Sequence, residues 1–338
     1  MGESQPILDP LSRAAMFLVV TIDDGGEPVA RDLLADLPGL RRSVGFRVPG
    51  ADLHCIVGIG SAAWDRLFAG PKPAELHDFP GYEGERHRAP ATPGDLLFHI
   101  KADAQDACFE LAMTIADRLR GAATIVDETV GFRYFEQRDL LGFVDGTENP
   151  EGRLAAGAAL VGAEDPEFAG GSYVVVQKYL HDLDSWNALP TREQERVIGR
   201  TKLDDFELSD AEKPANSHVA VNTLVDPDGT ERQILRANMP FGSVRDGEFG
   251  TYYIAYAATP SVTERMLTRM FLGSEEAAYD RILDFSTAVT GTLFFAPTVD
   301  FLDELPDPPG GDAPAADEPA LPAGEGSLGI GTLKRSTP

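Results

Sequence analysis

Cysteine and long apolar runs are both scarce in this chain of 338 residues. Its two cysteines, Cys55 and Cys108, are too few for a disulfide framework or a cysteine metal site. Each lies in an apolar stretch, so we expect both to be small core residues. The longest early apolar run, residues 14–22, is too short to cross a bilayer, and residues 1–6 show no signal-peptide pattern. The sequence predicts a soluble cytoplasmic protein with no membrane partner.

Positive charge is also scarce, because 29 Lys and Arg stand against 55 Asp and Glu, which gives a net charge of −26. A surface this acidic repels nucleic-acid phosphates and anionic lipids, which excludes partners of both kinds, whereas cations suit it. The chain has six histidines, and no pair has the spacing of a histidine-rich metal site. A histidine-bound metal would therefore need a prosthetic group to supply its other ligands.

The composition changes abruptly near residue 305. Residues 306–325 are rich in proline and acidic residues and contain one large apolar residue, which predicts a disordered linker. The final segment, residues 326–338, places Leu328, Ile330 and Leu333 among glycines and ahead of two positive charges. This pattern is typical of a docking peptide on a flexible tether. A frayed terminus with accidental leucines is the alternative.

The part before the linker shows a weak internal repeat. Two strand-like segments, 53–57 and 172–179, are each followed by a helical stretch that contains a tryptophan. Two further strand–helix pairs follow, with apolar residues at helical spacing in each helix: 95–101 before 104–119, and 251–257 before 261–271. We predict an α+β protein of duplicated ferredoxin-like domains, each an antiparallel sheet with packed helices, over residues 1–152 and 153–305.

One glycine motif resembles a dinucleotide-binding motif. The segment GIGSAA at 58–63 matches G-x-G-x-x-A between a strand and a helix. A dinucleotide site also needs an acidic residue about 20 positions later, at the end of a second strand, to hold the ribose. The residues there, 75–81, form a loop instead, so we interpret the glycines as a tight strand-to-helix turn.

The most unusual local sequence is LGFVDGTENP at 141–150. Its Asp145 lies between apolar residues and a glycine, which puts a carboxylate on a backbone that approaches other groups closely. An ordinary Asp–Gly turn is the alternative. Further along, His218 opens a strand or ends a loop. In residues 232–238, alternation places Arg236 and Asn238 on one face of a strand. That face is either buried, so that both polar side chains need hydrogen-bond partners, or exposed to water at the edge of a sheet.

Taken together, these residues resemble a known family. The GFVDGT segment at 142–147 matches the GxxDG pattern of dye-decolourising peroxidases, His218 matches their proximal haem ligand, and RANMP at 236–240 matches their distal arginine region. The resemblance covers roughly residues 8–305 and is strongest to the bacterial, B-type-like members. It implies the duplicated ferredoxin-like fold, with one haem b per chain in the second domain.

The resemblance also implies roles for particular residues. His218 would be the axial iron ligand, with Asp280 hydrogen-bonded behind it and Asp284 as the alternative, although either could be an ordinary helix carboxylate. Asp145 would move the peroxide proton, Arg236 would stabilise the departing oxygen, and Asn238 would orient the peroxide. The porphyrin would be approached by Gly146, Thr147, Glu148, Asn149 and Arg236. Phe271, Phe294 and Phe295 would pack on its faces, although core packing explains these three phenylalanines equally well.

The implied activity is the reduction of hydrogen peroxide coupled to one-electron oxidation of dyes and phenolic or lignin-like compounds. Substrates too large for a buried pocket would donate electrons through the haem edge or through surface aromatic residues. The candidates for the latter are Tyr252, Tyr253, Tyr256 and Trp186, for each of which core packing is the alternative. Mn(II) held at Glu148 is a further hypothesis for a small diffusible reductant.

Residues 328–334 resemble the cargo-loading peptide with which bacterial peroxidases of this family enter encapsulin nanocompartments. The encapsulin shell protein is therefore the predicted partner of residues 326–338, which would place the enzyme in the cytoplasm inside that compartment. A homo-oligomer fits this prediction, because avidity strengthens a weak docking peptide. Two other functions stay open: non-catalytic haem storage or transfer on the same fold, and an encapsulated binding protein without a cofactor.

Overall fold

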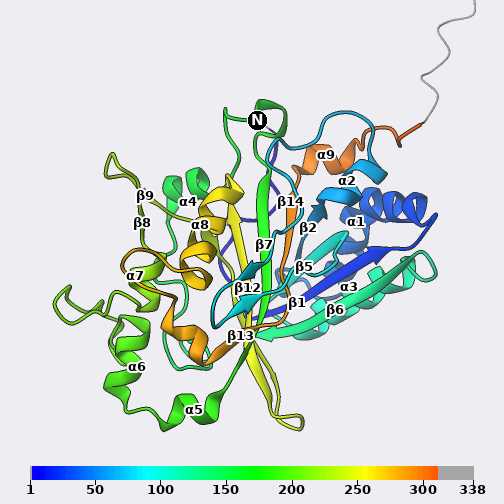
Figure 1. Ribbon diagram of the computed structural model, residues 1–338. Helices are drawn as coiled ribbons and strands as arrows, with labels where there is room; N and C mark the ends of the chain where they lie inside the picture. The colour runs from blue at the N-terminus through cyan, green and yellow to red at the C-terminus, as the bar shows by residue number, and fades with distance from the viewer. Residues whose placement is uncertain (1, 311–338) are drawn as a thin grey trace, which may run out of the picture.

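The computed structural model describes residues 2–310, and both halves of the chain contribute to one ten-stranded antiparallel sheet at its centre (Figure 1). The first half supplies four long strands and two long helices: β1 (Ala14–Ile22), α1 (Glu27–Arg47), β2 (His54–Gly60), β5 (Leu96–Ala102), α3 (Gln105–Arg118) and β6 (Ala123–Phe132). Across the sheet these strands lie in the order β2-β5-β1-β6.

The second half repeats this arrangement. Its strands are β7 (Ser172–His181), β10 (Leu235–Arg236), β11 (Met239–Ser243), β12 (Glu248–Ala257), β13 (Ser286–Ala288) and β14 (Thr292–Ala296). Its helices are α5 (Leu183–Ala188), α6 (Thr191–Ile198), α7 (His218–Asn222) and α8 (Pro260–Phe271). Across the sheet the second half runs β10-β12-β7-β14, with β11 also paired to β12 and β13 to β7. In both halves the four main strands therefore lie in the same order, the second strand of the half first, then its third, first and fourth.

Two units with the same β–α–β–β–α–β order and the same strand order are duplicated ferredoxin-like folds, which confirms the predicted fold class. They form one sheet because β14 pairs with β2, with Phe294 opposite Gly60 and Phe295 opposite Ile59. The boundary near residue 152 stays a prediction. In the structure, that residue begins α4 (Gly152–Ala159).

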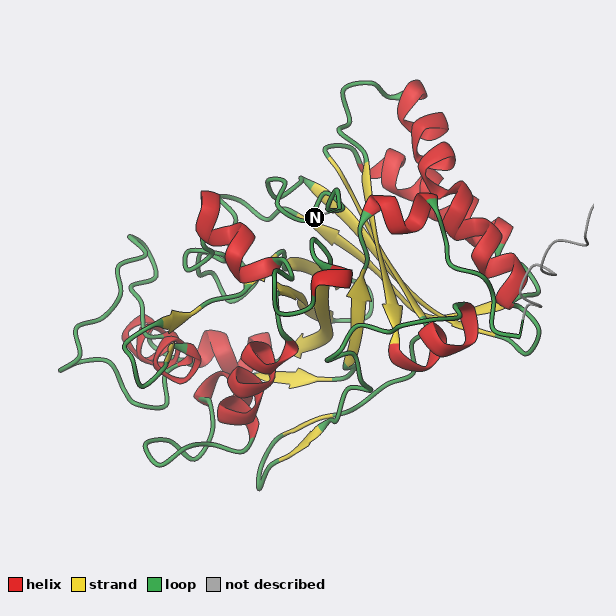
Figure 2. Ribbon diagram, turned by 90° about the horizontal axis from the view of Figure 1, so that it is seen from above, coloured by secondary structure: helices red, strands yellow, loops and turns green. Residues whose placement is uncertain are grey.

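The apolar periodicity explains the packing of the first half. On α1, Ala30, Leu33, Leu34 and Leu37 repeat at three and four residues and are buried. Helix α3 buries a similar stripe that includes Cys108, and Cys55 lies in β2, so both cysteines are buried and unpaired, as predicted. Figure 2 shows the helices in two groups, one against each half of the strands.

Close packing accounts for the glycines of the GIGSAA segment. A Cβ on Gly58 would lie 2.8 Å from the Cβ of Phe294, and one on Gly60 would lie 2.5 Å from the carbonyl oxygen of Gly94. Helix α2 (Ser61–Leu67) begins immediately after β2, which is the predicted strand-to-helix turn. Gly58 therefore allows the second half to pack against β2, Gly60 allows β2 to pass close to the loop before β5, and neither glycine lines the cavity described below.

The remaining elements are short and complete the second half and its borders. They are β3 (Tyr82–Glu83), β4 (Arg88–Ala89), the 3₁₀ helices η1 (Pro166–Phe168) and η2 (Arg281–Asp284), β8 (Leu224–Val225), β9 (Glu231–Arg232) and α9 (Val299–Asp303). Among the helices of residues 2–310, none combines the length and hydropathy that a membrane span requires. The predicted docking peptide and most of the predicted linker, residues 311–338, lie outside the described residues.

Candidate active site

A large cavity lies between strands β7 and β12 and helices α7 and α8 of the second half, and residues 139–148 of the first half complete its wall. The empty space inside it, the open mouth included, is about 1420 Å³. Much of the wall is apolar: Leu141, Phe143, Val144, Ile198, Val219, Ile234, Met266, Leu267, Met270 and Ile282. A flat apolar group of considerable size fits such a space, with polar residues at a few points.

His218 is the first residue of α7 and lines this cavity. Its predicted place at the start of a strand is wrong, whereas the alternative, the end of a loop, is correct to within one residue because the preceding loop ends at residue 217. Its Nδ1 lies 2.7 Å from Oδ2 of Asp280, a residue with no exposed surface. An ionised carboxylate only accepts hydrogen bonds, so Nδ1 carries the proton and Nε2 keeps its lone pair for the cavity. This is the geometry of a histidine prepared to ligate a metal.

Asp280 is held in place by further bonds. It caps η2, with Oδ1 accepting from the backbone N–H of Ile282 at 3.0 Å, and Oδ2 also accepts from Nδ2 of Asn222 at 3.2 Å. Asp284, the alternative partner, instead contacts Nε2 of His87 at 3.3 Å and does not reach His218. The structure thus pairs the histidine with Asp280.

A second polar group of the cavity centres on Asp145. Nδ2 of Asn238 donates to both carboxylate oxygens of Asp145, at 3.1 and 3.3 Å. Asn238 is itself fixed, because its Oδ1 accepts from the backbone N–H of Ile254 in β12 at 3.0 Å. The neighbouring Gly142 and Gly146 have φ of +92° and +85°, a region that favours glycine. The loop therefore needs these glycines to present Asp145 to the cavity.

Asn149 positions Arg236. Its Nδ2 donates to the carbonyl oxygen of Arg236 at 2.8 Å, and its Oδ1 accepts from the backbone N–H of the same residue at 3.0 Å. Asn149 is absent from the cavity wall, so its contact with a cofactor stays a prediction. Arg236 lines the cavity together with Arg232, Ile234 and Asn238, so the alternating face found in the sequence is the cavity face.

Ionic bonds connect the loop after Asp145 to a segment far along the chain. Nη1 of Arg200 lies 2.5 Å from Oε1 of Glu148, and its Nε lies 2.8 Å from Oδ1 of Asp205. Thr147 donates from Oγ1 to the same Asp205 at 2.6 Å. Thr147, Glu148 and Arg200 all line the cavity. Arg200 was not found from the sequence, where nothing distinguishes it from other surface arginines.

Two further titratable groups of the wall were also missed. Burial raises the pKa of Asp139 to about 7, an effect to which the nearby charge of Asp145 adds. Burial lowers the pKa of His181 to about 4, and its two ring nitrogens lie 2.8 and 3.0 Å from the hydroxyls of Ser286 and Thr251. His181 is therefore a neutral, fully bonded part of the wall.

Several predicted residues lie away from the cavity. Phe295 packs edge-on against Trp64, Phe168 and Tyr173 in the core, and Phe271 stacks near Tyr82, so neither ring belongs to the cavity wall. The prediction of surface aromatics is wrong for three of its candidates, because Tyr252, Tyr256 and Trp186 have no exposed surface. The fourth, Tyr253, lines the cavity.

Within residues 2–310, no three His, Cys, Asp or Glu side chains are grouped as a metal ion would need. A metal at His218 would therefore take its other ligands from a prosthetic group, for which the apolar cavity has room. A carboxylate-backed histidine and an Asp–Asn–Arg set in one cavity of a duplicated ferredoxin-like fold define a peroxidase of the class that the sequence resembles.

The comparisons with known proteins agree. Residues 4–133 match the family model for the N-terminal part of the Dyp-type peroxidases, and residues 136–301 match the model for the C-terminal part. The chain belongs to the Dyp-type peroxidase family and is an enzyme of that type. It is 61% identical to a dye-decolorizing peroxidase of Rhodococcus erythropolis over 98% of this chain and 97% of that protein.

Solved structures extend the similarity. The encapsulated DyP-type peroxidase from Mycobacterium smegmatis has a TM-score of 0.90 and 63% identity, covering 91% of this chain and all of that one. A variant of DypB from Rhodococcus jostii RHA1, solved in complex with heme, has a TM-score of 0.88 and 56% identity, covering 90% and 99% of the two chains. A DypB variant solved in complex with manganese has a TM-score of 0.87 and 56% identity, covering 89% of this chain and 98% of that one.

Proposed function

We propose that this chain binds one haem b in the cavity, where Nε2 of His218 would hold the iron, and reduces hydrogen peroxide at the expense of dyes and phenolic or lignin-like compounds. The observation that carries the proposal is that the His218–Asp280 pair and the Asp145–Asn238–Arg236 set line one apolar cavity. The heme complex of the DypB variant supports the choice of cofactor.

Bound haem supplies the iron and the redox chemistry, and the residues behind it prepare the ligand. Asp280 keeps the proton on Nδ1 of His218, so Nε2 is always free to coordinate. The buried negative charge also makes the ring more electron-donating, which favours the higher oxidation states of iron that a peroxidase needs.

The Asp145 set handles the proton of the peroxide. Ionised Asp145 takes a proton from one peroxide oxygen and returns it to the other, which leaves as water. Arg236 stabilises the negative charge that develops on the departing oxygen. Asn238 fixes the carboxylate through its two hydrogen bonds and presents its amide beside the place where peroxide is handled. Asn149 keeps Arg236 at the cavity wall through its backbone.

The docking peptide completes the proposal. Residues 326–338 bind the encapsulin shell protein, so that the enzyme works in the cytoplasm inside the compartment, and a homo-oligomer adds avidity. The encapsulated peroxidase of Mycobacterium smegmatis, which is 63% identical, supports this partner.

Mn(II) oxidation at Glu148 is a separate hypothesis with its own test. Glu148 lines the cavity, but its carboxylate is already paired with Arg200, so Mn(II) would have to displace the guanidinium. The substitution Glu148→Gln should remove saturation by Mn(II) while oxidation of a small phenol persists. Unchanged Mn(II) kinetics in this variant would exclude the site.

The visible spectrum after haemin addition tests the main proposal, recorded before and after one equivalent of peroxide for the wild type and His218→Ala. A Soret band that changes within seconds of peroxide addition and is weakened or altered in the variant is the expected result. A Soret band that does not change on peroxide addition would indicate the alternative, non-catalytic haem storage or transfer. Absence of any band would exclude haem.

A further inference from the structure

The carboxylate behind His218 has a second hydrogen-bond donor. Asn222 is the last residue of α7, four positions after His218, so the two side chains lie on the same face of the helix. Nδ2 of Asn222 donates to Oδ2 of Asp280 at 3.2 Å, and this is the oxygen to which Nδ1 of His218 donates at 2.7 Å. His218 and Asn222 therefore share one acceptor atom, and both line the cavity.

The orientation of the Asn222 amide is fixed by its neighbours. Besides Oδ2 of Asp280, its Nδ2 contacts the carbonyl oxygen of His218 at 2.8 Å. Both oxygens only accept hydrogen bonds, so the nitrogen of the amide and not its oxygen must face them. Nδ2 also lies 3.2 Å from Nδ1 of His218. Since both nitrogens carry hydrogen, this short distance is a consequence of the shared acceptor and not a hydrogen bond.

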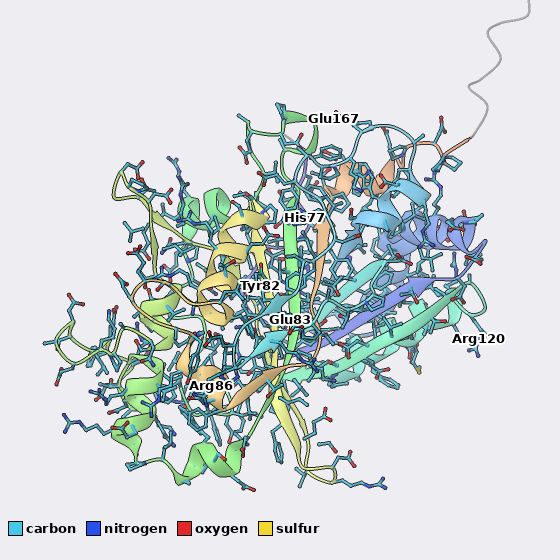
Figure 3. All side chains as sticks on the ribbon, in the orientation of Figure 1. His77, Tyr82, Glu83, Arg86, Arg120 and Glu167 are labelled. Carbon is cyan, nitrogen blue, oxygen red and sulfur yellow. The ribbon has the colours of Figure 1, made fainter. Side chains whose placement is uncertain are left out.

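The neighbouring carboxylate, Asp284, is engaged elsewhere. It faces the β3–β4 hairpin, where Arg86 and His87 lie 3.6 and 3.3 Å from its Oδ1. Figure 3 shows Arg86 in the turn of that hairpin, beside the segment that contains η2. Asp280, in contrast, has no exposed surface. In such surroundings each hydrogen bond changes the charge of a carboxylate more than it would in water.

We propose that Asn222 is a positioning residue that makes the bound haem more strongly oxidising and so widens the range of reductants that the enzyme can oxidise. The inference rests on the proposed function, because it requires Nε2 of His218 to hold the iron. A second donor draws negative charge from Oδ2 of Asp280, so the carboxylate pulls less strongly on the proton of Nδ1. The imidazole ring is then less anionic and donates less electron density through Nε2.

Asn222 and Asp280 thus act on His218 in opposite directions. The carboxylate makes the ring more electron-donating, and the amide limits this effect. A peroxidase needs both, because too little donation slows its reaction with peroxide and too much leaves it a weak oxidant of its reductants. Compounds that are hard to oxidise should therefore depend on the amide more than phenols that are oxidised easily.

The test compares the haem-loaded wild type with Asn222→Leu, which has nearly the same shape but no donor. The iron(III)/iron(II) equilibrium should shift about three- to tenfold toward iron(III), which lowers the midpoint potential by about 28–59 mV for one electron. Resonance Raman spectra of the iron(II) form should show the iron–histidine stretching band at higher frequency, because a more anionic ring binds iron more tightly. Asn222→Ala lacks the same donor and should shift both quantities in the same directions.

The matched control is Thr223→Val at the next position. Its hydroxyl donates to the carbonyl oxygen of Val219 at 2.9 Å, within the same short helix and away from Asp280. The potential and the band of this control should equal those of the wild type. Turnover provides a further comparison. The ratio of the rates for a dye that is hard to oxidise and for an easily oxidised phenol should fall about threefold or more in Asn222→Leu.

The direction of the Raman shift separates this role from a structural one. A ring that has only become looser binds iron more weakly and lowers the frequency of the band. A band at or below the wild-type frequency in both Asn222 variants would therefore overturn the inference, and the proposed function would stand because the band itself shows histidine bound to iron. Absence of the band from the wild type would overturn the proposed function together with the inference.

Discussion

The hydrogen bond between His218 and Asp280 allows a sharp prediction, because Asp280→Asn changes one atom of a fully buried side chain. The amide of asparagine keeps an acceptor for the backbone N–H of Ile282, which the carboxylate now binds at 3.0 Å. Toward His218 it presents either a donor or a much weaker acceptor. If the amide donates to Nδ1, the proton of the ring moves to Nε2, and a protonated Nε2 cannot bind iron.

The magnitudes of the two effects differ. A hydrogen bond to a charged group contributes about 1.5–3 kcal/mol and a neutral one about 1 kcal/mol, so the exchange lowers the free energy of unfolding by about 1–2 kcal/mol. At about 2–4 °C per kcal/mol, the apoprotein should melt only a few degrees lower. Loss of a carboxylate behind a metal-bound histidine typically lowers metal affinity about 10- to 100-fold, so haemin binding should suffer far more.

The assay is a haemin titration followed at the Soret band, together with thermal unfolding of the apoprotein. Asp95→Asn is the matched control, because this carboxylate is also mostly buried and bonded, to Arg66 and to the backbone of Ile22, but lies in the first half. The control should lose stability and keep its haemin affinity. Equal haemin affinity and an identical spectrum in Asp280→Asn and the wild type would refute the tautomer argument.

Three further predictions follow from the site and the tail. Asn149→Ala leaves the backbone of Arg236 without two partners, so unfolding measurements should show a loss of about 1–3 kcal/mol and the peroxide reaction should slow; an unchanged rate would contradict the positioning role. The pKa of Asp139 is raised in the folded state, so its contribution favours folding at low pH and is lost as pH rises from about 4 through about 7. In urea titrations Asp139→Asn should therefore gain stability over the wild type as pH rises, and a pH-independent difference would contradict the shift. Deletion of residues 326–338 should abolish co-purification with shells while peroxidase activity persists; continued loading would exclude the docking peptide.

Local patterns in the sequence were enough to predict several of the longer strands and helices. Strand and helix positions follow from side-chain periodicity, which depends only on neighbouring residues: the predicted helices 104–119 and 261–271 are α3 and α8, to within a residue or two. The duplicated ferredoxin-like fold was also predicted, since the same elements recur in the same order in both halves. The strand alternative for His218 was wrong because α7 has only five residues, too few to show a helical period.

The site required contacts that no local pattern contains. His218 and Asp280 are 62 residues apart, and Asp145 and Asn238 are 93 apart, so their pairing depends on how the helices and strands meet. The sequence offered both Asp280 and Asp284 for the histidine, and the tertiary structure separated them by turning one carboxylate inward and the other to the surface. Asp139, His181 and Arg200 joined the cavity wall without any signal in the sequence, for the same reason.

The sequence by itself determined the charge, the two repeated halves, the motif around Asp145 and the family to which the chain is similar. Each of these depends on composition or on residues close along the chain. Only the tertiary structure decided which side chains are buried, and burial sets both partners and exposure. It placed Phe271 and Phe295 in the core and away from the cavity, and it buried three of the four aromatic residues expected at the surface, because exposure is a property of the whole packed chain and not of any segment.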